Sequence, residues 1–120
     1  MKDFRKLKVW EKSHRLTLEL YKFAATLPKE ERYGLADQVR RAATSIPANI
    51  AEGCGRSTDV DQARFFQIAM GSASELDYHL LLARDLGFLS VEEHEKFFNN
   101  VVEVKKMLSG LITKLRSQGR

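Results

Sequence analysis

Four long segments with the hydrophobic period of an α-helix, separated by breaks of only a few residues, constrain the fold of this chain. Strand-like alternation of β-branched residues is absent. Long amphipathic helices joined by short loops favour antiparallel neighbours, so the sequence predicts an all-α, up-down-up-down four-helix bundle. At 120 residues the chain is expected to form a single domain spanning 1–120. The predicted helices run from Phe4 to Leu27, Tyr33 to Glu52, Asp59 to Leu86 and Val91 to Arg116.

The first two breaks contain residues that end one helix and begin the next. Pro28 ends the first helix, because a proline disfavours the helical conformation in the residue before it. Glu30 and Glu31 suit the positive N-terminal end of the second helix. Gly53 and Gly55 predict that this helix stops near Gly53 and that a left-handed turn follows.

The later boundaries show similar signals. Thr58 or Asp59 can cap the third helix, and Gly87 is expected to stop it. Ser90 and Glu93 have the spacing of a capping box, in which each side chain binds the other residue's backbone N–H. The fourth helix is expected to fray after Arg116.

The second predicted helix has an internal proline and little surface left for water. Pro47 removes one helical hydrogen bond and predicts a kink. A small-residue face, made by Thr44, Ala48 and Ala51, lies beside the apolar face. Helices with more apolar and small-residue faces than one bundle can bury indicate an interface, so we expect a closed homo-oligomer. The apolar face comprises Leu35, Val39, Ala43, Ile46 and Ile50.

A polar stripe along the same helix allows two interpretations. The first is structural: hydrogen-bonded polar groups fix the packing or the assembly, with Arg41 and Glu75 forming an ion pair inside the chain or between copies. The second is catalytic, a hydrolase or nuclease that uses Glu52 and Glu75, which are the best candidates for paired carboxylates. We favour the structural interpretation and expect no enzyme. The structural and interface candidates are Gln38, Arg41, Ser45, Asn49, Glu52 and Glu75.

Charge is distributed unevenly along the chain. Residues 1–15 hold six basic and two acidic residues, and residues 101–120 hold five and one, so each end carries +4. The middle, 16–100, has nine basic and thirteen acidic residues, a net charge of −4. In an up-down-up-down bundle both chain ends and the loop between the second and third helices meet at one pole. The opposite pole receives Glu30, Glu31, Asp85, Glu92, Glu93 and Glu95.

The basic pole predicts contacts with nucleic-acid phosphates, against the alternative of a solvated charged surface. Such contacts would give affinity without sequence preference. Trp10, Phe65 and Phe66 occupy helical positions and are expected in the core rather than as base-stacking platforms. The candidate nucleic-acid-binding residues are Arg5, Lys6, Lys8, Lys12, Arg15, Arg56, Arg64, Lys114, Arg116 and Arg120.

Other classes of function lack sequence support. No apolar run reaches the roughly 18 residues of a membrane span, and the basic N-terminus lacks the apolar core of a signal peptide. The lone Cys54 and three scattered histidines show no metal-ligand spacing. We therefore expect a cytoplasmic protein without metal or cofactor.

The segment from Ser45 to Gly53, SIPANIAEG, resembles the signature of the four-helix-bundle proteins encoded in intervening sequences of bacterial 23S rRNA genes. The resemblance implies a bundle that assembles as a homopentamer. Further matches follow in order along nearly the whole chain: Leu7–Trp10, Tyr21, Leu27–Pro28, Glu31, Gly34–Leu35, Gln38–Arg41, Ile68–Ser72, Glu75–Leu76 and Leu86–Leu89.

More distantly, the chain resembles the basic accessory bundles of diversity-generating retroelements, which work beside a reverse transcriptase. Two expectations follow from the charge pattern and these resemblances. The first is a non-enzymatic oligomer that binds nucleic acid, RNA in particular, through its basic pole. The second is an adaptor that enters a nucleic-acid complex together with a protein partner.

Overall fold

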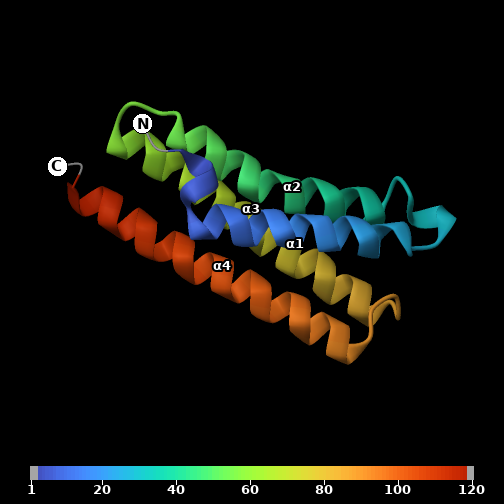
Figure 1. The fold of residues 1–120 in the computed structure, drawn as a ribbon. Helices are drawn as coiled ribbons and strands as arrows, with labels where there is room; N and C mark the ends of the chain where they lie inside the picture. The colour runs from blue at the N-terminus through green and yellow to red at the C-terminus, as the bar shows by residue number, and fades with distance from the viewer. Residues whose placement is uncertain (1–2, 119–120) are drawn as a thin grey trace.

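A computed structural model, described over residues 3–118, confirms the up-down-up-down four-helix bundle. The α1–α2 and α3–α4 connections lie at one end, and both chain ends and the α2–α3 loop lie at the other (Figure 1). The bundle measures 48 × 22 × 20 Å. No helix within residues 3–118 is both long enough and apolar enough to span a bilayer. The elements are η1 (Phe4–Lys6), α1 (Lys8–Ala25), η2 (Lys29–Glu31), α2 (Leu35–Cys54), α3 (Asp59–Asp85) and α4 (Val91–Gln118).

The predicted first helix is divided in two. Asp3 caps the short 3-10 turn η1 by accepting a hydrogen bond from the backbone N–H of Arg5. Leu7 is extended, with φ −82° and ψ 128°, so the chain turns before α1 begins at Lys8. The prediction of one continuous helix from Phe4 was therefore wrong, because the extended backbone of Leu7 separates η1 from α1.

The predicted caps of the later helices are present. Glu31 Oε1 accepts the backbone N–H of Leu35 at 3.1 Å, at the start of α2. Thr58 Oγ1 accepts the N–H of Asp61 at 3.1 Å, at the start of α3. Ser90 and Glu93 form the reciprocal capping box of α4, with both hydrogen bonds 3.1 Å long. The hydrogen bonds from Ser90 lower the pKa of Glu93, and α4 stays helical beyond Arg116, to Gln118.

The end of α2 differs from the prediction. Gly53 lies inside the helix, which continues to Cys54. Gly55 follows with φ −85°, so no left-handed turn forms there. Gly53 serves packing instead: a Cβ built at this position would lie 2.9 Å from Phe66 Cε1. The predicted glycine stop occurs at Gly87, whose φ is +84°.

Pro47 lies within α2, and the rest of the bundle compensates for its missing N–H. Proline leaves the carbonyl of the residue four positions earlier without its helical donor. That carbonyl belongs to Ala43, and the buried hydroxyl of Thr17 on α1 lies 3.1 Å from it in donor geometry. The same hydroxyl is 2.8 Å from the Ser13 carbonyl, so the two oxygens share one donor. The kink at Pro47 stays a prediction.

The core lies along the bundle axis, and one of its four seams is looser than the others. Phe66, Leu76 and Leu80 of α3 are completely buried. α2 packs closely on α1 and α3, and α3 on α4, whereas α1 makes far fewer contacts with α4. The loose α1–α4 seam leaves a groove on one side of the bundle.

Candidate nucleic-acid interface

η1, the start of α1, the α2–α3 loop, the start of α3 and the end of α4 lie at one end of the bundle (Figure 1). These segments are rich in lysine and arginine. We call this surface the basic pole. Its cations come from η1, α1, the α2–α3 loop, α3 and α4, because the antiparallel topology places the start of α1 beside the end of α4. Arg120 lies outside the described residues. The described members are Arg5, Lys6, Lys8, Arg56, Arg64, Lys114 and Arg116.

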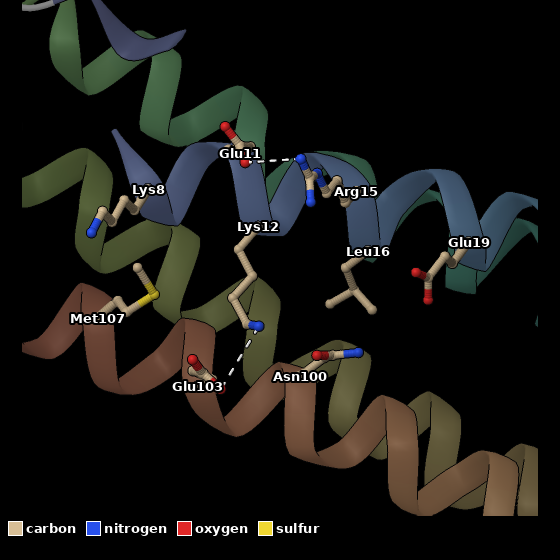
Figure 2. Close-up of a pocket in the computed structure, with 9 residues that line it drawn as sticks. All are labelled: Lys8, Glu11, Lys12, Arg15, Leu16, Glu19, Asn100, Glu103 and Met107. Atoms are coloured by element: carbon tan, nitrogen blue, oxygen red, sulfur yellow. Dashed lines mark ion pairs between the residues drawn. The ribbon is translucent and has the colours of Figure 1, made fainter. Parts of the chain in front are cut away.

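Lys12 and Arg15 belong to the α1–α4 groove rather than to the pole. Lys12 Nζ reaches across the seam to Glu103 Oε2 at 3.7 Å, and Arg15 pairs with Glu11 at 3.1 Å (Figure 2). Because an α-helix rises about 1.5 Å per residue, Arg15 lies roughly 10 Å along the axis from the start of α1. The groove has a volume of about 490 Å³ and three cations against three carboxylates. Its lining is Lys8, Glu11, Lys12, Arg15, Leu16, Glu19, Asn100, Glu103 and Met107.

Acidic residues at the pole pair with three of its four described arginines. Arg56 donates to Glu52 at 2.7 Å, and its Nε lies 3.7 Å from Asp61. Arg64 pairs with the same Asp61 at 3.0 Å. Near the N-terminus, Arg5 pairs with Asp3 at 3.3 Å. The sequence prediction counted the cations and missed these partners, although the three- and four-residue spacings of Arg56–Glu52 and Arg64–Asp61 are typical of ion pairs on a helix surface.

Three lysines at the pole carry charge without such a partner. Lys6, Lys8 and Lys114 are exposed, and no hydrogen bond or ion pair engages their ammonium groups within residues 3–118. Lys6 and Lys8 come from η1 and the start of α1, and Lys114 comes from the end of α4, far away in the sequence. An unpaired ammonium group needs no internal ion pair to break before it binds an anion. These three lysines are therefore the strongest phosphate ligands that the pole offers.

The polar stripe of α2 contributes to packing only in part. Ser45 and Ser72 bind each other at 2.7 Å and join α2 to α3. Asn49 donates to the Ser45 carbonyl at 2.8 Å and lies 3.0 Å from the Ser45 hydroxyl. Gln38 is exposed.

The predicted internal pair between Arg41 and Glu75 does not form. Arg41 pairs with Asp37, four residues earlier, at 2.9 Å, and its side chain is 76% exposed. Glu75 lies instead 3.5 Å from His79. Asp37 and Arg41 share one helix face, as do Glu75 and His79, so these local pairs form. The α2–α3 packing leaves Arg41 turned to solvent. An Arg41–Glu75 pair between two copies stays a prediction.

The geometry argues against a site built on Glu52 and Glu75. The Ser45–Ser72 hydrogen bond sets the register of α2 against α3. From that level Glu52 lies seven residues toward the basic pole, and Glu75 lies three residues away from it. At about 1.5 Å per residue the two carboxylates are separated by roughly 15 Å along the axis. Paired carboxylates in hydrolases of the glycosidase type lie within about 10 Å.

The aromatic candidates have different environments. Phe66 is completely buried in the core, as predicted. Phe65 is half-buried at the surface, and the guanidinium groups of Arg56 and Arg64 each lie 4.5 Å from its ring centre. Trp10 is also half-buried and stacks on His14 with ring centres 4.8 Å apart. Phe65 is thus bound into the charged surface, an arrangement that helical periodicity alone did not predict.

Fold and site together define a four-helix-bundle protein with lysine and arginine side chains gathered at one end. The family model described as 23S rRNA-intervening sequence protein matches residues 5–110, and the chain belongs to that family. A solved structure from Bacteroides thetaiotaomicron, titled as a protein with unknown function from the S23 ribosomal protein family, is similar in fold, with a TM-score of 0.78. It is 28% identical, and the match covers 87% of this chain and 97% of that one. No curated protein matches the sequence.

Proposed function

We propose that this protein is a non-enzymatic, cytoplasmic homo-oligomer that binds nucleic acid, RNA in particular, through phosphate contacts at the basic pole. The observation that supports it is the convergence of Lys6, Lys8 and Lys114, three exposed lysines without internal partners, from the two ends of the chain. An ammonium group is a compact charge that suits phosphate oxygens. Contacts of this kind give affinity without sequence preference.

RNA is favoured over DNA by the comparisons. The matching family is described by its place in 23S rRNA genes, and the similar structure is assigned to a ribosomal protein family. These names associate the family with ribosomal RNA, and the proposal that this chain binds RNA is ours.

A salt titration tests the binding mode. We expect the affinity for RNA to fall linearly on a log–log plot against salt concentration, with a slope of roughly −2 to −3 if three phosphates are neutralised. Binding should be similar for RNAs of unrelated sequence. Fluorescence anisotropy of labelled RNA at several salt concentrations measures both properties. A flat salt response, or binding restricted to one sequence, would contradict a phosphate-based interface.

The oligomer is supported by apolar surface that the single bundle leaves exposed. Leu18 and Tyr21 are 53% and 46% exposed beside an apolar groove of about 400 Å³ between α1 and α2. Exposed apolar patches on soluble proteins usually mark interfaces. Ala48, one of the predicted small residues of α2, lies in this groove. On α3, two large apolar side chains farther from the basic pole are exposed: Tyr78 and Leu81. Two distinct faces fit a head-to-tail contact that closes into a ring, and the family resemblance implies five members.

Replacing Ala48 with Glu is expected to dissociate the oligomer, because a carboxylate buried in an apolar contact has no compensating partner. Ser109→Glu, which puts the same charge on an exposed position of α4, is the control and should leave the assembly intact. Multi-angle light scattering of wild type and both variants measures the mass. A wild-type monomer at micromolar concentration would contradict the oligomer, and an assembled Ala48→Glu variant would exclude the α1–α2 groove as its contact.

A second candidate function is an adaptor that needs a protein partner, and the α1–α4 groove favours it. Balanced charge above Leu16 and Met107 suits an amphipathic protein segment better than a phosphate backbone. RNA binding that appears only after a partner protein is added would support this candidate over the first.

A further inference from the structure

A hollow at the basic pole combines an apolar floor with a cationic rim. It lies between the first turns of α3 and the end of α4 and has a volume of about 450 Å³. Arg64 and Arg116 line it and supply its two cations, and none of its lining residues is acidic. The lining residues are Val60, Ala63, Arg64, Gln67, Ile68 and Arg116.

The apolar floor is unexpected at the charged end of the molecule. Val60 is 66% exposed and Ile68 is 42% exposed. Phosphate groups do not bind an apolar surface of this kind, since they bind cations and stay hydrated. The floor instead suits the flat face of a base, and the rim suits the anion attached to it.

The two arginines of the rim keep donors available. Arg64 uses its Nε for Asp61 at 3.0 Å, which leaves the terminal nitrogens of the guanidinium group. One terminal nitrogen of Arg116 donates a weak hydrogen bond to Gln67 Oε1 at 3.4 Å, and this contact holds the guanidinium group beside the hollow. Planar guanidinium groups bind phosphate in a bidentate manner and also stack on π systems.

We propose that this hollow seats an unpaired base of single-stranded nucleic acid while Arg64 and Arg116 contact the neighbouring phosphates. The inference rests on the proposed function and specifies its ligand class. A duplex buries its base faces in the stack and offers only phosphate and sugar to this surface. A single strand offers both groups that the hollow can bind, and stacking of this kind tolerates any base. A second copy of the chain is the competing occupant, but a lining with two arginines and no acidic residue favours an anionic ligand.

The experiment uses the full chain and three probes of about 12 nucleotides, within the size range of single-strand sites. These are a mixed-sequence RNA without self-complementarity, the same RNA annealed to its complement, and an abasic RNA of equal length. The test variant is Val60→Ser with Ile68→Ser. The matched control is Leu86→Ser with Val91→Ser, which removes apolar side chains of similar exposure, 53% and 65%, at the opposite end.

Wild type should bind the single strand roughly tenfold more tightly than the duplex or the abasic RNA. The test variant should lose most of that preference and keep its affinity for the other two probes, while the control binds all three as wild type does. The proposal is overturned if wild type binds the abasic and single-stranded RNAs equally, or if the test variant keeps the preference. A changed mass in light scattering would assign the hollow to a contact between copies. If wild type binds none of the probes at low salt, the proposed function fails as well.

Discussion

Replacing Lys6, Lys8 and Lys114 together with Glu is expected to abolish RNA binding and to leave the fold and the assembly intact. All three side chains are exposed, and no ion pair engages them within residues 3–118, so the folded chain loses no internal ion pair. Each lost phosphate contact should lower the log–log salt slope by roughly 0.7–0.9. The reversed charges add repulsion, so the loss of affinity at low salt should exceed that of simple neutralisation to Gln.

The matched control reverses Lys22, Lys29 and Lys96, which are equally exposed and lie on other parts of the bundle. The net charge changes by the same amount, so a general loss of attraction would appear in both variants. We expect the control to bind with only a modest decrease. Lys12 is left unchanged because it pairs with Glu103 across the α1–α4 seam. If the variant with Glu at positions 6, 8 and 114 binds RNA as tightly as wild type at low salt, the basic pole is a solvated surface and the function lies elsewhere.

Gly53→Ala is expected to destabilise the protein, although alanine is the better helix former. The new Cβ would lie 2.9 Å from Phe66 Cε1 and 3.2 Å from the Gln62 carbonyl oxygen. Phe66 is completely buried and cannot swing aside, so α2 and α3 must separate locally. Overpacking of this kind costs about 1–3 kcal/mol, which exceeds the gain of about 1 kcal/mol in helix propensity. Thermal unfolding should show a melting temperature several degrees lower.

Gly110→Ala provides the comparison, because Gly110 lies within α4 with no atom within 4 Å of an added Cβ. It should raise stability by up to about 1 kcal/mol through helix propensity alone. Opposite signs for the two substitutions would show that Gly53 serves close helix packing. Stabilisation by both would mean that the α2–α3 contact relaxes without cost.

Local sequence signals account for the helices and their caps. The Ser90–Glu93 capping box, the Thr58 cap and the Gly87 stop depend on residues within four positions of each other, so their pattern is visible in the chain. The same local signals mislead at the N-terminus and at Gly53. An Asp3 cap and an extended Leu7 separate η1 from α1. Gly53 resembles a helix stop, but it lies inside α2 and allows Phe66 of α3 to pack closely.

The meeting of both chain ends at one pole also follows from the sequence, because four helices with short connections can only alternate in direction. Which cations remain available there was decided by the tertiary structure. Arg64 pairs with Asp61 three residues away on the same helix, which its spacing could have shown. Arg56 reaches Asp61 from the α2–α3 loop, and Lys12 reaches Glu103 from another helix. Ion pairs between helices need atoms within about 4 Å, and that distance depends on the rotation and register of whole helices. The sequence by itself therefore determined the helices, their order and the polarity of charge, whereas only packing decided the free lysines, the role of Gly53 and the hollow beside Arg116.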